Sequence, residues 1–267
     1  MYEVTAAHRG GAGTPLVCLH GFMDTWRTWE LVLPALERHH DVLAPTLTGH
    51  AGGPPLEREV SDGLLADAVE RAMDEAGFDT AHLVGNSLGG YVVLTLAARG
   101  RADSVVALAP AGGWPTGDGS FTAAAAHFRT MHELLQTAAP YADRIVATAE
   151  GRRRATEFTT SNFEHIPAEL LAHQICGAAL CDVGPLLELG LRDGWGLDAE
   201  RITCPVRIIW GTDDKLLEWP SSAARLREDW LPHADWTVLE GVGHCPQLDV
   251  PTETAALILE FTDRRGS

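Results

Sequence analysis

The stretch His82-Leu83-Val84-Gly85-Asn86-Ser87-Leu88-Gly89 decides how this chain folds. Its first three residues predict a short buried strand, and residues 88–99 predict a helix that Gly100 ends. Between strand and helix, residues 85–89 match the pattern G-x-S-x-G, in the context where a sharp turn can present a serine as a nucleophile. The flanking glycines relieve crowding, so the turn can hold Ser87 in a strained conformation with its hydroxyl exposed.

Short apolar runs and helical patterns alternate on both sides of this turn. We expect strands at 16–19, 41–44, 82–84, 105–109, 206–210 and 236–239. We expect helices at 26–38, 60–76, 88–99, 221–230 and 252–261. Such alternation predicts an α/β fold, with a mostly parallel sheet covered by helices on both faces.

The middle of the chain breaks this rhythm. Residues 114–197 are rich in alanine and helical in pattern, and they contain no convincing strand. We therefore expect a core made of residues 1–113 and 198–267, with residues 114–197 inserted between two strands as a helical cap. Most aromatic residues of the insertion are expected to pack its own small core, and some to face the site, because closed pockets are mostly apolar.

Composition excludes several classes of function. The net charge of −17 argues against nucleic acid and anionic membrane surfaces as partners. The five cysteines are scattered without a Cys-x-x-Cys pair, which suggests neither a disulfide framework nor a zinc site and fits a reducing compartment. We find neither the apolar run of a signal peptide nor 18 consecutive apolar residues, so we expect a cytoplasmic protein with no membrane span.

A serine nucleophile needs a base, and the base needs a group that orients it. His244 follows the last predicted strand in a glycine-rich loop, although a histidine there can also be a loop residue of no consequence. Asp213 and Asp214 follow the strand that ends at Trp210. Ligands of open α/β sheets bind outside the carboxyl ends of the strands, where both segments are expected. The residues alone leave open which aspartate would orient the histidine.

Four segments together resemble one family. They are His20-Gly21-Phe22, residues 85–90, Trp210-Gly211-Thr212-Asp213-Asp214 and Gly243-His244-Cys245-Pro246. They resemble the α/β-hydrolase superfamily, specifically its cap-bearing, esterase-like serine hydrolases, over the whole chain except the insertion. The resemblance implies the α/β-hydrolase fold, with Ser87 as nucleophile, His244 as base and Asp214 as the orienting acid.

The resemblance also implies an oxyanion hole made by two backbone N–H groups, those of Phe22 and Leu88. By the same analogy, Met23 and Trp114 are expected to line the substrate pocket. The His-Gly-Phe segment differs from the His-Gly-Gly-Gly run of another esterase branch. With about fifteen residues before the first buried strand, the family's leading hairpin is expected to be short or incomplete.

These features predict a serine hydrolase that needs no cofactor or metal. Its expected partner is a small to medium, fairly apolar carboxylic ester or lactone, cleaved through an acyl-enzyme on Ser87. Carbon–carbon bond hydrolases, thioesterases and cofactor-free perhydrolases use the same triad, so the fold does not decide among them. Epoxide hydrolases and haloalkane dehalogenases carry a carboxylate where Ser87 stands and are disfavoured. A non-hydrolytic ligand-binding or cyclase-like protein stays open, as do the exact substrate and the oligomeric state.

Overall fold

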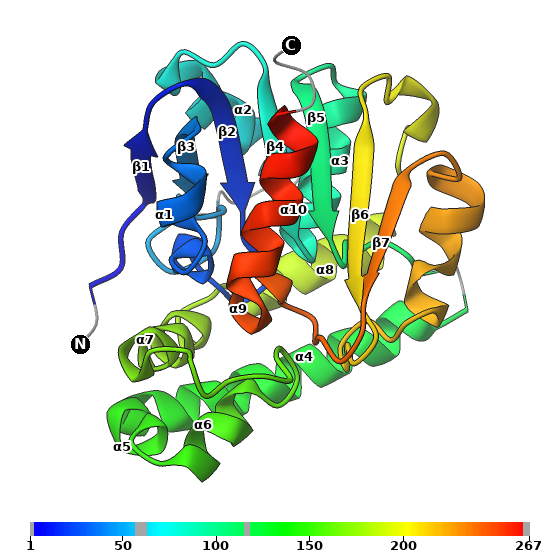
Figure 1. Cartoon of the computed structure of the whole chain (residues 1–267). Coiled ribbons are helices and arrows are strands. Elements are labelled where there is room, and N and C mark those ends of the chain that lie inside the picture. The colour runs from blue at the N-terminus through cyan, green and yellow to red at the C-terminus, as the bar shows by residue number, and fades with distance from the viewer. Residues whose placement is uncertain (1–2, 57–62, 115–117, 264–267) are drawn as a thin grey trace.

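A computed structural model describes residues 3–56, 63–114 and 118–263 (Figure 1). Within them a seven-stranded sheet has the order β1-β3-β2-β4-β5-β6-β7. At one edge β1 runs antiparallel to β3, and every other pairing of the sheet is parallel, as the sequence predicts. The strands are β1 (Ala7–Gly11), β2 (Thr14–Leu19), β3 (His40–Pro45), β4 (Ala81–Asn86), β5 (Ala102–Leu108), β6 (Val206–Gly211) and β7 (Asp235–Leu239).

Alternate residues of the central strands are buried on opposite faces of the sheet. In β2, Leu16 and Cys18 belong to one hydrophobic core and Val17 and Leu19 to the other, and all four are fully buried. Successive side chains of a strand point to opposite faces, so burial on both faces explains the continuous apolar runs of the sequence. The covering helices are α1 (Leu33–Leu36) and α10 (Pro251–Asp263) on the first face, and α2 (Leu64–Ala76) and α3 (Leu88–Ala98) on the second (Figure 1).

Between β5 and β6, the described residues form five α-helices. They are α4 (Ser120–Ala138), α5 (Ala142–Val146), α6 (Ala149–Thr156), α7 (Ala168–Ala179) and α8 (Val183–Asp193). In Figure 1, α4 to α7 lie together beyond the end of the sheet toward which β2 and β6 point. Leu170 and Ile175 of α7 pack against Val146 of α5 in a separate small core. The insertion therefore covers the carboxyl ends of the strands, while its predicted limits at 114 and 197 stay predictions.

The two ends of the insertion are joined to each other through the core. Nη1 of Arg225 donates hydrogen bonds to the backbone oxygens of Trp114, at 2.8 Å, and Trp195, at 3.1 Å. The guanidinium group also lies 4.4 Å from the centre of the Trp230 ring. The side chain of Arg225 thus holds together the two points where the chain passes between the sheet and the inserted helices.

Two predicted helices differ from the structure, and β1 is a strand that the sequence pattern does not predict. Residues 26–38 form a 3₁₀ turn, η1 (Trp26–Trp29), and then α1, because Pro34 lacks an N–H and fits only the first turn of a helix. Residues 221–230 form a 3₁₀ turn, η4 (Ser221–Ala223), and a π-helical turn, η5 (Leu226–Trp230), instead of one α-helix. The predicted start of the helix at 60–62 lies outside the described residues.

Three short elements complete the described part of the chain. Two of them are η3 (Ala199–Arg201) before β6 and α9 (Pro246–Asp249) before α10. Another short 3₁₀ turn, η2 (Ala139–Tyr141), joins α4 to α5. In the part of the chain that the structure describes, no single helix is long and apolar enough to cross a membrane. Only α7 and α8 together, bent by 66°, meet that criterion of length and composition.

Candidate active site

The turn at Ser87 is strained and held from several sides. Ser87 has φ 55° and ψ −116°, between the end of β4 and the first residue of α3. Residues other than glycine avoid this region, and such strain persists only where the surroundings over-determine it. The Ser87 N–H donates to the oxygen of Leu108 at 2.9 Å, and its own carbonyl accepts from the N–H groups of Tyr91 and Ala111. The fold therefore fixes the position of the Ser87 hydroxyl.

The two glycines of the motif are required by close backbone contacts. A Cβ atom at Gly85 would lie 2.3 Å from the oxygen of Gly89, and one at Gly89 would lie 2.3 Å from the oxygen of Leu19. Because the opposing atoms belong to the backbone, no side chain can move aside. The glycines of G-x-S-x-G are therefore needed because α3 packs closely against β2 and β4.

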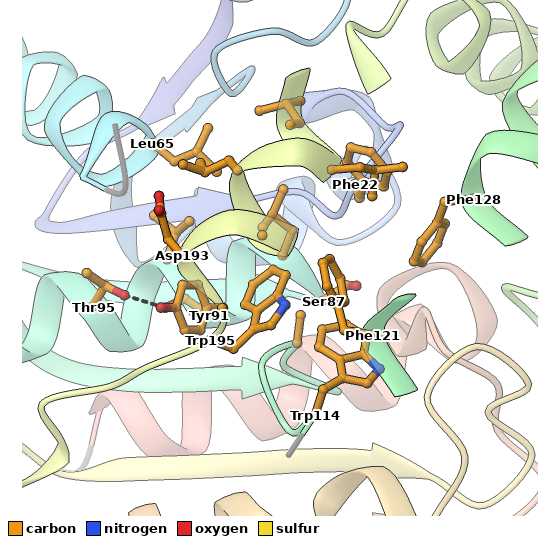
Figure 2. Close-up of a pocket in the computed structure, with 18 of the residues that line it drawn as sticks. Phe22, Leu65, Ser87, Tyr91, Thr95, Trp114, Phe121, Phe128, Asp193 and Trp195 are labelled. Atoms are coloured by element: carbon orange, nitrogen blue, oxygen red, sulfur yellow. Dashed lines mark hydrogen bonds between the residues drawn. The ribbon is translucent and has the colours of Figure 1, made fainter. Parts of the chain in front are cut away.

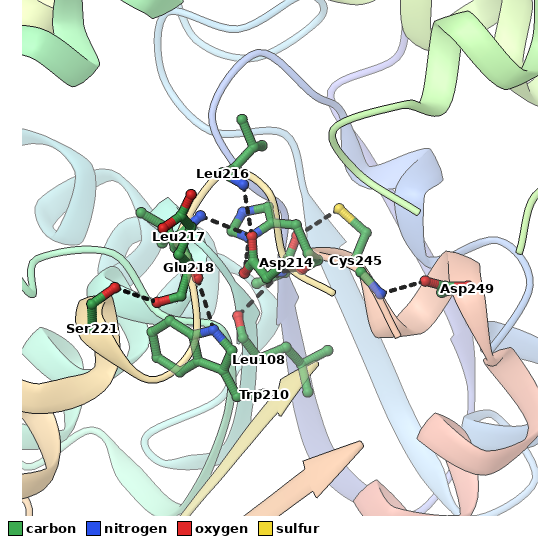
Figure 3. A network of polar contacts seen from close by, with 12 residues as sticks. Leu108, Trp210, Asp214, Leu216, Leu217, Glu218, Ser221, Cys245 and Asp249 are labelled. Carbon is green, nitrogen blue, oxygen red and sulfur yellow. Dashed lines mark hydrogen bonds and ion pairs between the residues drawn. The ribbon is translucent and has the colours of Figure 1, made fainter. Parts of the chain in front are cut away.

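Asp214 and His244 form a buried pair. Oδ2 of Asp214 lies 2.7 Å from Nδ1 of His244, while Oδ1 accepts from the backbone N–H groups of Leu216 and Leu217 (Figure 3). A carboxylate at Nδ1 favours the tautomer with hydrogen on that nitrogen, which leaves Nε2 to accept a proton. Asp213 is exposed, and its carboxylate accepts from the hydroxyl of Thr212. The structure therefore brings Asp214, and not its neighbour, to the histidine.

Ser87 and His244 line one large cavity beneath the insertion. Its volume is about 750 Å³, and Phe22 and Met23 also contribute to its wall. An ideal Cβ at Gly21 would lie 3.2 Å from Cβ of Ser87, so the 20–22 loop is in contact with the serine. Leu88 is the first residue of α3, where a helix leaves backbone N–H groups without internal partners. These positions are those that the predicted oxyanion hole requires, and its donors stay a prediction.

His20 fixes this loop instead of taking part as an acid or base. Its Nε2 accepts from the N–H of Leu47 at 2.8 Å, and Nδ1 donates to the oxygen of Gly21 at 2.7 Å. Burial, together with nearby His50, holds the pKa of His20 well below its usual value. A neutral ring with both nitrogens engaged joins the 20–22 loop to the segment after β3.

Asn86, at the unrestricted second position of the motif, connects three parts of the site. Its Nδ2 donates to the backbone oxygens of His244, at 2.9 Å, and Leu108, at 3.1 Å. Its Oδ1 accepts from Nε2 of Gln247 at 3.2 Å. Sequence reasoning missed this role, since its only signal is an amide at the end of a buried apolar strand.

Asp249 was also missed. Its carboxylate is 2 % exposed and accepts from the N–H of Gly243 at 2.6 Å and the N–H of Ser161 at 2.8 Å. The backbone and side-chain amides of Asn162 donate to its other oxygen, both at 2.7 Å. One buried carboxylate thus ties the loop before His244 to the insertion.

Cys245 is not a second nucleophile. Its Sγ donates to Oδ1 of Asn86 at 3.4 Å. Burial, and then the nearby carboxylates of Asp24, Asp214 and Asp249, raise the pKa of this thiol well above its usual value. Because the reactive form of cysteine is the thiolate, the protonated Cys245 is inert.

A smaller cavity lies on another side of Ser87. Its volume is about 100 Å³, and Figure 2 shows Tyr91, Trp114, Phe121 and Trp195 gathered around it. The two residues expected to line the substrate pocket, Met23 and Trp114, thus line different cavities. Met23 lines the larger cavity and Trp114 the smaller one. Across the described ranges, no cluster of three or more histidine, cysteine or acidic side chains is arranged to hold a metal ion.

The family model for the alpha/beta hydrolase family matches residues 16–257, which is most of the chain. The chain belongs to the α/β hydrolase family. Among curated proteins, this hydrolase is 34 % identical over 211 residues to epoxide hydrolase EphH of Mycobacterium tuberculosis, a match that covers 76 % of this chain and 96 % of that one.

A second relative of this α/β hydrolase is named for ester cleavage. It is 31 % identical over 263 residues to pimeloyl-[acyl-carrier protein] methyl ester esterase of Aromatoleum aromaticum, with 91 % of this chain and 96 % of that one covered. Among solved structures, a thermophilic esterase from Thermogutta terrifontis superposes with a TM-score of 0.72 at 19 % identity, covering 97 % of this chain and 93 % of that one. At that identity the likeness shows the fold alone.

Proposed function

We propose that this α/β hydrolase cleaves a small to medium, fairly apolar carboxylic ester or lactone through an acyl-enzyme on Ser87. The observation that carries the proposal is that His244, paired with the buried Asp214, lines the same cavity as a strained serine. A serine, a base and an orienting acid are the three parts that nucleophilic acyl transfer needs.

In the first step, Nε2 of His244 takes the proton of the Ser87 hydroxyl while Oγ attacks the ester carbonyl. The carbonyl oxygen becomes an oxyanion, which the N–H groups of Phe22 and Leu88 stabilise by donating to it. The carbon–oxygen bond to the alcohol then breaks, and the leaving oxygen takes the proton from the imidazolium. Asp214 stabilises that imidazolium throughout and keeps its own charge.

In the second step, His244 takes a proton from water, and the resulting hydroxide attacks the acyl carbon. The bond between that carbon and Oγ of Ser87 breaks, and the proton returns from His244 to the serine. The acid product leaves, and the free hydroxyl is restored. The same cycle serves thioesters, activated carbon–carbon bonds and perhydrolysis, which remain the alternatives within this mechanism.

An epoxide substrate, as the name of the mycobacterial relative suggests, suits a serine poorly. Attack by Oγ of Ser87 on an epoxide carbon would open the ring and form an ether. Water activated by His244 has no carbonyl to attack in an ether, so the enzyme would stop after one turnover. An ester substrate leaves an acyl-enzyme that the same water hydrolyses, which favours the ester reaction.

The test is labelling by a fluorophosphonate together with turnover of 4-nitrophenyl esters. We expect labelling of the native protein, none of Ser87→Ala, and a burst of 4-nitrophenol equal to the amount of enzyme. An aryl epoxide serves as the competing substrate. Steady diol formation from it, with no ester turnover, would overturn the proposal. Labelling without turnover of any ester, thioester or diketone would favour the non-hydrolytic alternative.

The proposal also includes the location of the protein in the cytoplasm.

A further inference from the structure

Two cavities of very different size meet at Ser87, and they differ in which of them reaches the base. The serine lines both, with Phe22 and Phe128. His244 lines the cavity of about 750 Å³ and, among the described residues, is not part of the wall of the cavity of about 100 Å³. An ester bound at Ser87 therefore has two unequal spaces for its two halves.

The chemistry of the first step decides which half goes where. The leaving oxygen must take its proton from Nε2 of His244, so it must come within about 3 Å of that nitrogen. The alcohol half accordingly lies on the side of His244, in the larger cavity. The acyl half, bonded to Oγ of Ser87, is left with the smaller cavity on the other side.

We infer that the smaller cavity binds the acyl group and the larger cavity binds the alcohol, so that the substrate is an ester of a short or flat acid with a bulky alcohol. This inference rests on the proposed acyl-enzyme mechanism. The smaller cavity, at about 100 Å³, leaves room for a short or flat group, and the larger cavity, at about 750 Å³, leaves room for a bulky one.

The walls of the smaller cavity are stiff as well as close. The ring of Trp195 lies 4.9 Å from that of Tyr91, 5.0 Å from that of Trp114 and 5.2 Å from that of Phe121, measured between centroids. Figure 2 shows these rings around the serine. Tightly packed aromatic side chains move little, so this cavity cannot enlarge enough to accept a long acyl chain.

Polar side chains also line the larger cavity. Asp24 and Gln174 line it, and Nε2 of Gln174 donates to the Asp24 carboxylate at 3.3 Å. Toward the outer helices, Glu150 and Arg154 form an ion pair at 2.8 Å on the same wall. A bulky alcohol with hydrogen-bonding groups finds partners there.

The experiment is a matrix of esters that varies each half separately. One series joins 4-nitrophenol to acids from acetic to octanoic, and the other joins acetic acid to aryl alcohols of similar acidity, from phenol to a substituted naphthol. We expect kcat/KM to fall at least 100-fold from the butanoyl to the octanoyl ester, and to change less than tenfold as the alcohol grows. Steep loss with the alcohol and tolerance of the acid would reverse the assignment.

Two matched variants test the same point from the protein side. Phe121 lines the smaller cavity and Phe158 the larger, and both are phenylalanines of the insertion. Phe121→Ala should raise the octanoyl-to-acetyl ratio of kcat/KM at least tenfold, and Phe158→Ala should change only the alcohol series. The opposite pattern would overturn the inference. The native matrix decides the matter if a variant fails to fold, and fluorophosphonate labelling of Ser87 reports separately on the acyl-enzyme.

Discussion

Oδ2 of Asp214 lies 2.7 Å from Nδ1 of His244, and the side chains of the pair are no more than 4 % exposed. Asparagine at 214 would retain the shape but would favour the wrong tautomer of the imidazole. We expect Asp214→Asn to lower kcat by about 10⁴.

The matched control for that variant is Asp213→Asn, because Asp213 is exposed one residue away. It should cost less than tenfold in kcat. The two variants are compared on one activated ester after their circular dichroism spectra are shown to agree with that of the native protein. A larger loss from Asp213→Asn would show that Asp213, and not Asp214, is the acid that orients His244. The roles of Ser87 and His244 would be unaffected.

Substitutions at Ser87 should separate chemistry from strain. Both Ser87→Ala and Ser87→Gly remove the nucleophile, and each should lower kcat by about 10⁶. Alanine keeps the unfavourable φ of 55°, whereas glycine accepts it without cost. We therefore expect Ser87→Gly to unfold in urea with a free energy about 1 kcal/mol higher than Ser87→Ala. Equal stability would mean that the turn is not strained, and more than a tenth of native activity in either variant would remove Ser87 from the mechanism.

Asp249 should matter for activity although it does not line either cavity. Asp249→Asn removes acceptor capacity from a carboxylate that holds the N–H groups of Gly243 and Ser161. We expect about 1–3 kcal/mol less stability toward urea, from the unpaired buried donors. We also expect a tenfold or greater fall in kcat with little change in KM, because the His244 loop is less well placed.

The control is Glu253→Gln, an exposed acidic residue in the first turn of α10. It should leave both quantities within error of the native values. A loss of stability in Asp249→Asn without any loss of kcat would show that the carboxylate supports the fold but not the position of His244.

Asp24 should make stability depend on pH. Burial raises its pKa to about 6, against the partial compensation of hydrogen bonds from Thr25, Thr28 and Gln174. A folded-state pKa above the unfolded value of about 3.9 stabilises the folded protein below pH 4, and this contribution is lost as pH rises through 6. Asp24→Asn should therefore gain stability relative to the native protein between pH 4 and pH 8, by up to about 3 kcal/mol.

Urea unfolding of both proteins at pH 4, 5, 6, 7 and 8 measures this difference. Asp213→Asn again serves as the reference, since that residue lies at the surface. If the difference in free energy of unfolding between Asp24→Asn and the native protein stays constant with pH, burial does not disfavour the ionised form of Asp24.

The sequence predicts the parallel strands well because the central ones, such as β4 and β6, are buried on both faces and appear as apolar runs. β1 escapes prediction for the opposite reason. Its residues, Ala-His-Arg-Gly-Gly, include no β-branched side chain, and the strand exists because its backbone pairs with β3 at the edge of the sheet. Nothing in the local sequence of β1 indicates that it pairs with β3, whose residues lie about thirty positions away.

The same distinction separates the parts of the site. Glycine spacing marks the turn at Ser87, because steric limits act between near neighbours in the chain. Asn86 and Asp249 act through hydrogen bonds to segments as far as 161 residues away. Their side chains are ordinary for a turn or a helix end, so nothing in the local sequence distinguishes them from solvated polar residues.

The insertion between β5 and β6 separates the halves of the site in time as well as along the chain. Ser87 is made before the five inserted helices, and Asp214 and His244 are made after them. At about 5–20 residues per second, synthesis takes on the order of 8–30 s to proceed from the serine to the histidine. During that interval the nascent chain holds a serine without its base, so a ribosome-bound chain ending before Gly241 should resist fluorophosphonate.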